Sequence, residues 1–252
     1  MRYHRKTAPK VIFGQVQRQN RWHASAHDYS QTHQIRIERD PAPPGHRHLV
    51  SPPDVSAFLA LLPDWRELSI GLRRVVLSDD VECFGWHRPG TVAVCAWPAG
   101  FEHVFSPQFY HDNAPLLRRI GVPCRPVVLP DSATCPSCSA DLQPYAWNLC
   151  PSCHASIGGA YREAAAGAEG LRYLAAFTES SAQAFLLVDV LVHEMGHHHD
   201  RMTSPGRRQI TRGERYAEDY ARRHEDVIWP AYCRVFRPRG EPRSRRWAPS
   251  GR

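Results

Sequence analysis

The pentapeptide His193-Glu194-Met195-Gly196-His197 constrains the fold of this chain more than any other feature of its sequence. It follows the almost uninterrupted apolar run 184–192, which predicts a buried helix. Residues four apart lie on one face of a helix, so His193 and His197 can direct their imidazoles at one metal ion. Glu194 lies one step further round and can reach a water molecule at that ion. The pattern is typical of zinc hydrolases, with two histidine ligands and Glu194 as general base.

The rest of this helix, expected from about Ser180 to His199, supports the metal hypothesis. Gly196 costs a helix interior about 1 kcal/mol relative to alanine, so we interpret it as room for close packing beside the metal. The alternative is a histidine-rich helix end that faces solvent. That alternative suits His198, His199 and Asp200 better than the two ligand candidates, because a buried histidine needs a polar partner.

A catalytic zinc ion needs a third protein ligand. The metzincin continuation is absent, since Asp200 and Thr203 occupy its glycine and histidine positions. A second helix is expected from about Thr211 to Val227, and its Glu214 is the favoured third ligand. The alternatives are Glu218, His224 and Asp200. Thr211-x-x-Glu214 also matches a capping box, in which the Glu214 carboxylate would accept a hydrogen bond from the backbone amide of Thr211. The two roles compete for the same carboxylate.

The segments His193-Glu194-x-x-His197 and Glu214-x-x-Ala217-Glu218-x-Tyr220-Ala221 together resemble the gluzincin metallopeptidases, in particular the minimal enzymes of the ImmA/IrrE type. The resemblance covers about residues 180–225. It implies an α+β fold with a zincin-like core, in which a small mixed sheet accompanies the active-site helix and a Glu-bearing helix. It also implies that Glu214 ligates zinc and that Glu218 supports a zinc-bound histidine, although the family has Asp or Asn at that position. Asp189 and Asp219 are further candidates to orient a histidine.

Such a site predicts peptide hydrolysis. Zinc lowers the pKa of a bound water towards about 7, and Glu194 accepts a proton as the water attacks a carbonyl carbon. The candidate donors to the oxyanion are Tyr216, Tyr220 and His198. The predicted strand Thr91–Trp97 is the candidate edge for pairing with an extended peptide. Its apolar residues on both faces are, however, more typical of an interior strand.

A second metal site is predicted from the duplicated units Cys135-Pro-Ser-Cys138 and Cys150-Pro-Ser-Cys153, which are separated by 11 residues. Four thiolates in two such units form a tetrahedral structural zinc site that is closed to water. We therefore expect an inserted zinc ribbon at 131–158 that folds only with its ion. A redox dithiol is the alternative, but the duplication and the lack of a surrounding βαβ pattern argue against it. Cys124 and His154 are spare neighbours that can replace a ligand.

The remaining pattern predicts five segments and a set of short elements. The segments are a polar N-terminal extension or β arm (1–50), the first part of the core (51–130), the ribbon (131–158), the active-site helices (159–233) and a disordered basic tail (234–252). Strands are expected at Val11–Val16, Gln34–Ile37, Leu72–Ser78, Val81–Trp86, Thr91–Trp97 and Val127–Leu129. Further helices are expected from a cap at Asp54 and over Asn113–Ile120.

Composition narrows the function class. The chain has 252 residues and a net charge of +7, which favours polyanionic partners only weakly. It has no apolar run near the ~20 residues of a membrane span, and no apolar stretch follows the basic N-terminus, so we expect no secretory signal and a cytoplasmic protein. Cys83, Cys95, Cys124 and Cys233 are expected to be free thiols.

Two functions of different classes follow. The first is a zinc metallopeptidase, most simply an endopeptidase, with one catalytic and one structural Zn²⁺ and a peptide or protein substrate. The second is a regulatory or binding protein on a zincin fold, which contacts protein or nucleic acid, the latter weakly through its basic termini. The glutamate at position 194 favours the first, because a protein without hydrolytic activity does not need the base.

Overall fold

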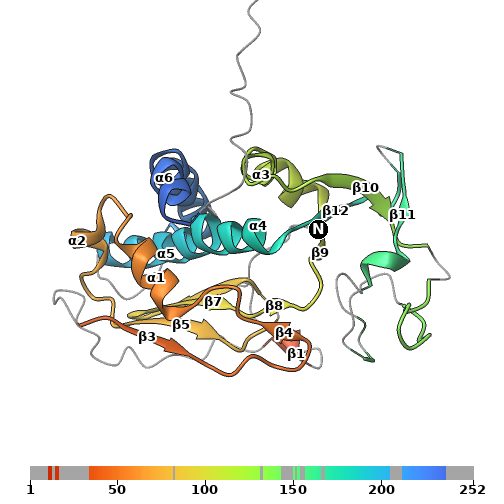
Figure 1. Cartoon of the computed structure of the whole chain (residues 1–252), viewed down its shortest axis with the longest axis horizontal. Coiled ribbons are helices and arrows are strands. Elements are labelled where there is room, and N and C mark those ends of the chain that lie inside the picture. Colours follow the sequence, from red (N-terminus) through yellow and green to blue (C-terminus); the bar gives the residue numbers. More distant parts are fainter. Residues whose placement is uncertain are drawn as a thin grey trace, which may run out of the picture.

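The computed structural model describes residues 11–12, 15–16, 34–81, 83–130, 133–142, 150, 152–153, 157–165, 168–204 and 212–236. Within this part, the chain is a mixed α and β protein with small sheets (Figure 1). The predicted α+β class is therefore confirmed. The predicted tail from residue 237 onward and the spare ligand His154 lie outside the described residues.

The first sheet has the strand order β3-β5-β7-β6 and is mixed, as predicted. Its parallel strands are β3 (Arg36–Arg39), β5 (Arg74–Ser78) and β7 (Thr91–Cys95), and β6 (Gly85–Arg88) runs antiparallel to β7. All five residues of β7 are buried. A strand that is apolar on both faces and hydrogen-bonded on both sides is interior. The expectation that Thr91–Trp97 forms a free edge is therefore wrong, and β6 lies at that side of the sheet.

Helices cover one face of this sheet (Figure 1). The first are α1 (Pro52–Leu59) and α2 (Trp65–Leu68). The cap of α1 is Ser51 rather than the predicted Asp54. The Ser51 hydroxyl accepts from the Asp54 amide, and the Asp54 carboxylate accepts from the Ser51 amide at 2.8 Å, which forms a capping box.

The long helical segment above the sheet has three parts, α4 (Glu179–Ala184), the π-helical η2 (Phe185–Leu191) and α5 (Val192–Thr203). Every residue of η2 is buried, in agreement with the apolar run in the sequence. The predicted helix is thus present over its whole length, with a π-helical middle. Such segments are rare and frequent at functional sites.

The last helix, α6 (Gly213–Phe236), continues nine residues beyond the predicted end at Val227. Trp229, Tyr232 and Phe236 follow one another on one face, with ring centroids 5.5 and 4.8 Å apart. Tyr232 also lies 6.4 Å from Phe58 of α1. This aromatic packing stabilises the extra turns, so residues 234–236 belong to the helix and not to the predicted tail.

The second sheet has the order β11-β10-β12-β9 and is antiparallel. Its strands are β9 (Glu102–Phe105), β10 (Cys124–Val128), β11 (Arg162–Glu163) and β12 (Arg172–Ala176). The cysteine-rich segment leaves β10 and returns through the short helix η1 (Gly158–Ala160) to β11. It has its own small core, which includes Val127, Ile157 and Leu174.

Several predicted boundaries move. Helix α3 (Pro107–Arg119) begins before the predicted Asn113, because the Ser106 hydroxyl caps it and Pro107 suits the first helical position. Strand β3 pairs with β5, so the end of the predicted N-terminal extension belongs to the first sheet. The remaining strands are β1 (Val11–Ile12), β2 (Gln15–Val16), β4 (His46–Arg47) and β8 (Trp97–Pro98).

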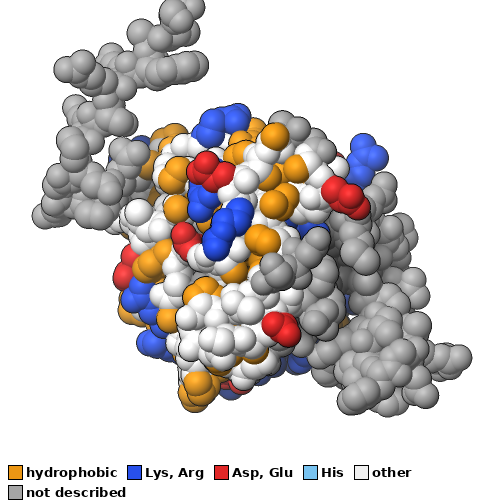
Figure 2. Space-filling model, turned by 90° about the vertical axis from the view of Figure 1, so that its right-hand side faces the viewer, with side chains coloured by type: hydrophobic (Ala, Val, Ile, Leu, Met, Phe, Trp, Pro, Cys, Tyr) orange, Lys and Arg blue, Asp and Glu red, His pale blue; other side chains and the backbone are white. Residues whose placement is uncertain are grey.

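The surface on the side of the second sheet is mixed. Figure 2 shows hydrophobic side chains interspersed with basic and acidic ones on the described part of this face. None of the described helices combines the length and the apolar character needed to cross a membrane.

Candidate metal centre

Helices α5 and α6 bring together a group of three side chains that can bind a metal ion, His193, His197 and Glu214. One potential ligand atom from each lies within 4.8 Å of the other two. The Glu214 carboxylate lies between the imidazoles, with one oxygen 3.2 Å from Nε2 of His193 and the other 3.4 Å from Nε2 of His197. Both histidines are almost fully buried. Two imidazoles and a carboxylate form a ligand set that suits a divalent transition metal.

Gly196 allows the two helices to meet. A Cβ at this position would lie 2.9 Å from Cα of Ala217 and 3.0 Å from Cβ of Tyr220. Only glycine therefore fits between the two histidines at this spacing of the helices. The expected close packing is present, and the neighbour is the helix that carries Glu214.

Asp200 fixes the start of α6. Its fully buried carboxylate accepts hydrogen bonds from the backbone amides of Arg212 and Gly213, at 3.0 and 2.9 Å, and from the Arg212 side chain at 2.8 Å. It also accepts from the Ser204 hydroxyl at 2.8 Å. Burial opposes ionisation of this carboxyl, but these donors hold its pKa below the usual range. Asp200 is thus a cap that holds the residue before Glu214, and it lies outside the metal group.

The carboxylate and the imidazoles of the group shift one another's pKa. Burial opposes ionisation of Glu214, but hydrogen bonds from His193 and His197 hold the pKa of its carboxyl well below the usual range. Burial opposes protonation of His197, and the carboxylates of Glu214, Glu194 and Asp200 outweigh it and raise the pKa of the imidazole. The group therefore keeps an ionised carboxylate at neutral pH, which a cation would complement.

Glu194 lies beside the group and against the edge strand β6. Its side chain is 3% exposed. A Cβ at Gly85 of β6 would lie 3.0 Å from Cγ of Glu194 and 2.6 Å from a methyl group of Val190. Strand β6 therefore packs on α5 with the backbone of Gly85 in contact with the expected base.

A further histidine that was not predicted from the sequence lies next to the group, His87 of β6. Its ring centroid lies 6.1 Å from that of His197, in a stacked arrangement, and 6.0 Å from that of His198. Gly85 and His87 are two residues apart on a strand and share the face towards α5. This alternation was the available signal, but the predicted strand at Val81–Trp86 ended before His87.

The three oxyanion candidates make contacts elsewhere. The Tyr216 hydroxyl lies 2.6 Å from Nδ1 of His199, and the Tyr220 ring stacks on His224 at 4.1 Å. Nε2 of His198 lies 2.9 Å from the carbonyl oxygen of Ile70. These contacts lie on the side of α5 and α6 that faces α2, because Glu67 of α2 is 3.6 Å from His199.

Glu218 and His224, which the sequence also offered as third ligands, lie outside the metal group as well. The Glu218 side chain is 47% exposed, and its carboxylate lies 3.8 Å from Arg222. Nδ1 of His224 bonds the Tyr220 carbonyl oxygen at 2.9 Å. Glu214 is therefore the third member of the group, as the sequence favoured.

The two aspartates that the sequence offered as orienting groups, Asp189 and Asp219, are not members of the metal group either. Asp219 is exposed and lies 3.5 Å from Arg222. Asp189 lines a cavity of about 220 Å³ between α3, η2 and α6.

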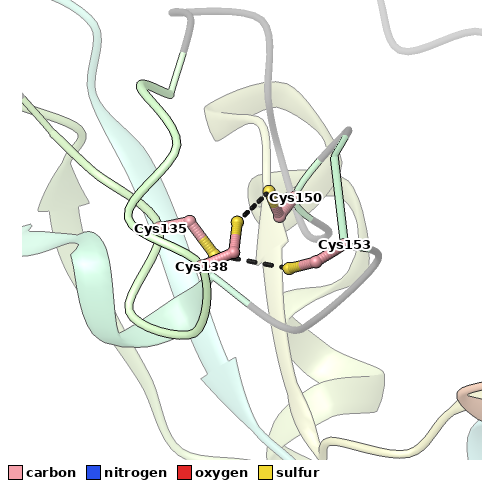
Figure 3. Close-up of side chains that lie close together, drawn as sticks. All are labelled: Cys135, Cys138, Cys150 and Cys153. Carbon is pink, nitrogen blue, oxygen red and sulfur yellow. Dashed lines mark hydrogen bonds between the residues drawn. The ribbon is translucent and has the colours of Figure 1, made fainter.

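The four cysteines Cys135, Cys138, Cys150 and Cys153 form a second group that can bind a metal ion. Their side chains point towards one another (Figure 3), with sulfur distances of 3.6 Å for Cys135–Cys153 and 3.7 Å for Cys138–Cys150. The spare neighbour Cys124 lies outside the group. Its burial raises the pKa of its thiol to about 11.

Backbone amides prepare these sulfurs for a cation. The amides of Ser137 and Ser152 donate to Cys135 and Cys150, each at 3.4 Å. The amide of Cys153, followed by that of Ser152, lowers the pKa of Cys150 to about 6. A thiolate is the form that binds metal, so these amides favour the metal-binding state of Cys135 and Cys150.

Comparisons with protein-family models, with curated proteins and with solved structures found no match to this chain.

Proposed function

We propose that this protein is a zinc-dependent metallopeptidase whose catalytic ion is held by His193, His197 and Glu214. The observation that carries the proposal is the meeting of these three ligand groups with Glu194 beside them. Two of the groups come from one helix and the third from another, so their convergence depends on tertiary packing and not on the sequence pattern alone. The gluzincin resemblance and this convergence are separate arguments for one reaction class.

The donor set fits zinc. A catalytic zinc site has three protein ligands drawn from His, Glu, Asp and Cys and leaves one position open. The group contains two imidazoles and one carboxylate, and it is buried except for Glu214, whose side chain is 19% exposed. When bound there, zinc would supply Lewis acidity and a water molecule of lowered pKa.

The protein's own groups would complete the chemistry. Glu194 would accept the proton of the attacking water and pass it to the leaving amine, the role of a general base and then a general acid. Its burial beside Gly85 restricts its side chain and excludes bulk water. His87 lies against His197 and is a candidate to hold that imidazole in place.

Strand β6 is the proposed substrate edge. It pairs with β7 on one side, and among the described residues no strand pairs with its other side. An extended peptide that adds to this side would run beside Glu194 and His87. Glu194 contacts Gly85 of β6, and His87 is itself a residue of β6. This assigns to β6 the role that the sequence analysis gave to Thr91–Trp97.

The four-cysteine group is proposed to hold a second, structural zinc ion. Four sulfur ligands leave no open position for water, so this ion would stabilise the fold of the segment and take no part in hydrolysis. The segment joins strands β10 and β11 of the second sheet.

The test combines metal content with turnover. Wild type should hold two zinc ions per chain by elemental mass spectrometry and should hydrolyse an unfolded protein or a peptide library. Glu194→Gln should keep both ions and lose hydrolysis by about 10²-fold or more, and His197→Ala should lose one ion. The exposed Glu218→Gln is the matched control and should retain both properties.

The same variants distinguish the peptidase from the alternative function. A regulatory or nucleic-acid-binding protein would hold two ions, hydrolyse nothing, and respond equally to Glu194→Gln and Glu218→Gln. Equal hydrolysis by wild type and Glu194→Gln would also overturn the proposed mechanism.

A further inference from the structure

Two cysteines outside the four-cysteine group lie side by side at the beginning of β6. Cys83 is in the bend that precedes β6, and Cys95 is the last residue of β7. Their sulfur atoms are 3.8 Å apart. Neither belongs to a group of described residues that can hold a metal ion.

We propose that Cys83 and Cys95 are a modification site, at which a peroxide converts the two thiols to a reversible disulfide. The sulfurs would have to approach from 3.8 Å to about 2.05 Å. The two segments already adjoin, because the Cys95 amide donates to the Phe84 carbonyl oxygen at 2.8 Å. Cys83 precedes the regular strand, so the bend can supply the remaining movement.

The reaction balances in two steps. The Cys83 thiolate attacks one peroxide oxygen, the O–O bond breaks, and water leaves after protonation, which gives a sulfenic acid. The Cys95 sulfur then attacks the Cys83 sulfur, the S–O bond breaks, and a second water leaves. The two thiols lose two electrons and two protons, and the peroxide is reduced to two water molecules.

The environment of the sulfurs sets the order of these steps. Cys83 is half-buried, whereas Cys95 is 2% exposed, so peroxide reaches Cys83 first. The contact with Cys83, followed by burial, raises the pKa of the Cys95 thiol. The Cys95 sulfur is thus sheltered from peroxide and stays in contact with the Cys83 sulfur, where it can attack once Cys83 is oxidised.

The disulfide would act on the metal centre through β6. Gly85 follows Cys83 by two residues and has no free space towards Val190 and Glu194. A pull of the bend towards β7 would therefore shift the strand over Glu194. We expect kcat to fall and zinc content to stay unchanged, and this consequence rests on the proposed peptidase function.

The experiment uses the full chain loaded with zinc and treated with hydrogen peroxide. Free thiols are then alkylated, and mass spectrometry follows a chymotryptic digest, which can cut at Phe84 and Trp86 between the two cysteines. The expected product is a pair of peptides joined through Cys83 and Cys95, lighter by two hydrogen atoms than the separate peptides, and separated again by dithiothreitol. Cys124→Ser, a half-buried cysteine elsewhere, is the matched control and should still give the linked pair.

The results separate this site from the function. Two results would overturn the modification site. In the first, Cys83 is oxidised to sulfinic acid while Cys95 stays a free thiol and is alkylated. In the second, both cysteines are still free after peroxide and are alkylated. Both results are read from wild type, so they do not depend on the folding of a variant. A linked pair in a chain that hydrolyses no peptide would retain the site and reject the peptidase. A linked pair with unchanged kcat would reject the coupling through β6, for which Cys83→Ser provides a peroxide-insensitive reference.

Discussion

Gly196 and Ala217 place the backbones of α5 and α6 in contact at the level of the metal group. A Cβ at Gly196 would lie 2.9 Å from Cα of Ala217. Gly196 stands between the two histidines, and Ala217 stands one turn after Glu214. The distance between the histidines and the carboxylate is therefore set by a position that has no side chain.

Gly196→Ala should separate the helices and weaken metal binding. Helix propensity would favour alanine by about 1 kcal/mol, but overpacking against backbone atoms costs about 1–3 kcal/mol, so we expect net destabilisation. Zinc at the helix group should dissociate at a lower chelator concentration than in wild type. The matched control is Gly159→Ala, where a Cβ would meet only Pro136 at 3.9 Å. An unchanged chelator titration of Gly196→Ala would contradict the assignment.

Asp200→Asn should release the start of α6. Asparagine keeps only one acceptor oxygen. Its NH2 group would therefore face donors that now bond one of the two carboxylate oxygens, either the backbone amides of Arg212 and Gly213 or the Ser204 hydroxyl and the Arg212 side chain. Loss of these charge-assisted bonds costs about 1–3 kcal/mol. We expect a lower midpoint of urea unfolding and weaker zinc binding at Glu214, with the four-cysteine group unaffected. The exposed Asp219→Asn controls for loss of one negative charge, and equal effects of the two variants would reject the capping role.

Cys138→Ser should remove the ion of the four-cysteine group and disorder its segment. The small core around Ile157 contains Cys135 and Cys150 themselves, so it depends on the cluster. Hydrogen exchange should rise in peptides that cover residues 133–142 and 157–161, while α5 keeps its protection. Cys233→Ser, a half-buried cysteine of α6, should leave the exchange of that segment as in wild type. Protection of the segment in zinc-free protein would show that it folds without metal.

His103 should make the fold sensitive to acid. Its ring is buried beside Phe84 and Phe105, at 4.7 and 4.8 Å, and burial lowers the pKa of its imidazole from 6.5 to about 3. Between pH 6.5 and about pH 3, His103 binds a proton in the unfolded chain but not in the folded chain. The free energy of unfolding should thus be unaffected by this group above pH 6.5 and fall below it, by up to about 1.4 kcal/mol per pH unit.

His103→Phe should flatten this part of the pH profile, measured by urea unfolding between pH 7 and about pH 4. The exposed His111→Gln should retain the wild-type slope. Parallel profiles for all three proteins would show that His103 does not cause the dependence.

The sequence by itself determined the local elements of both metal groups. The helical spacing of His193 and His197 inside an apolar run and the duplicated Cys-Pro-Ser-Cys turns are patterns within a few residues, so local geometry is enough to predict them. The mixed sheet and the α+β class also followed from periodicity and from the resemblance.

Only the tertiary structure decided which groups meet across elements. Glu214 and Glu218 lie one turn apart on the same helix, and the contact of Gly196 with Ala217 decides which of them reaches the histidines. Asp200 is a cap rather than a ligand because the start of α6 returns to it. The position of β6 at the sheet edge and the contact between the Cys83 and Cys95 sulfur atoms depend on strand order. Strand order and helix packing arise from contacts between residues far apart in the chain, and no local pattern encodes them.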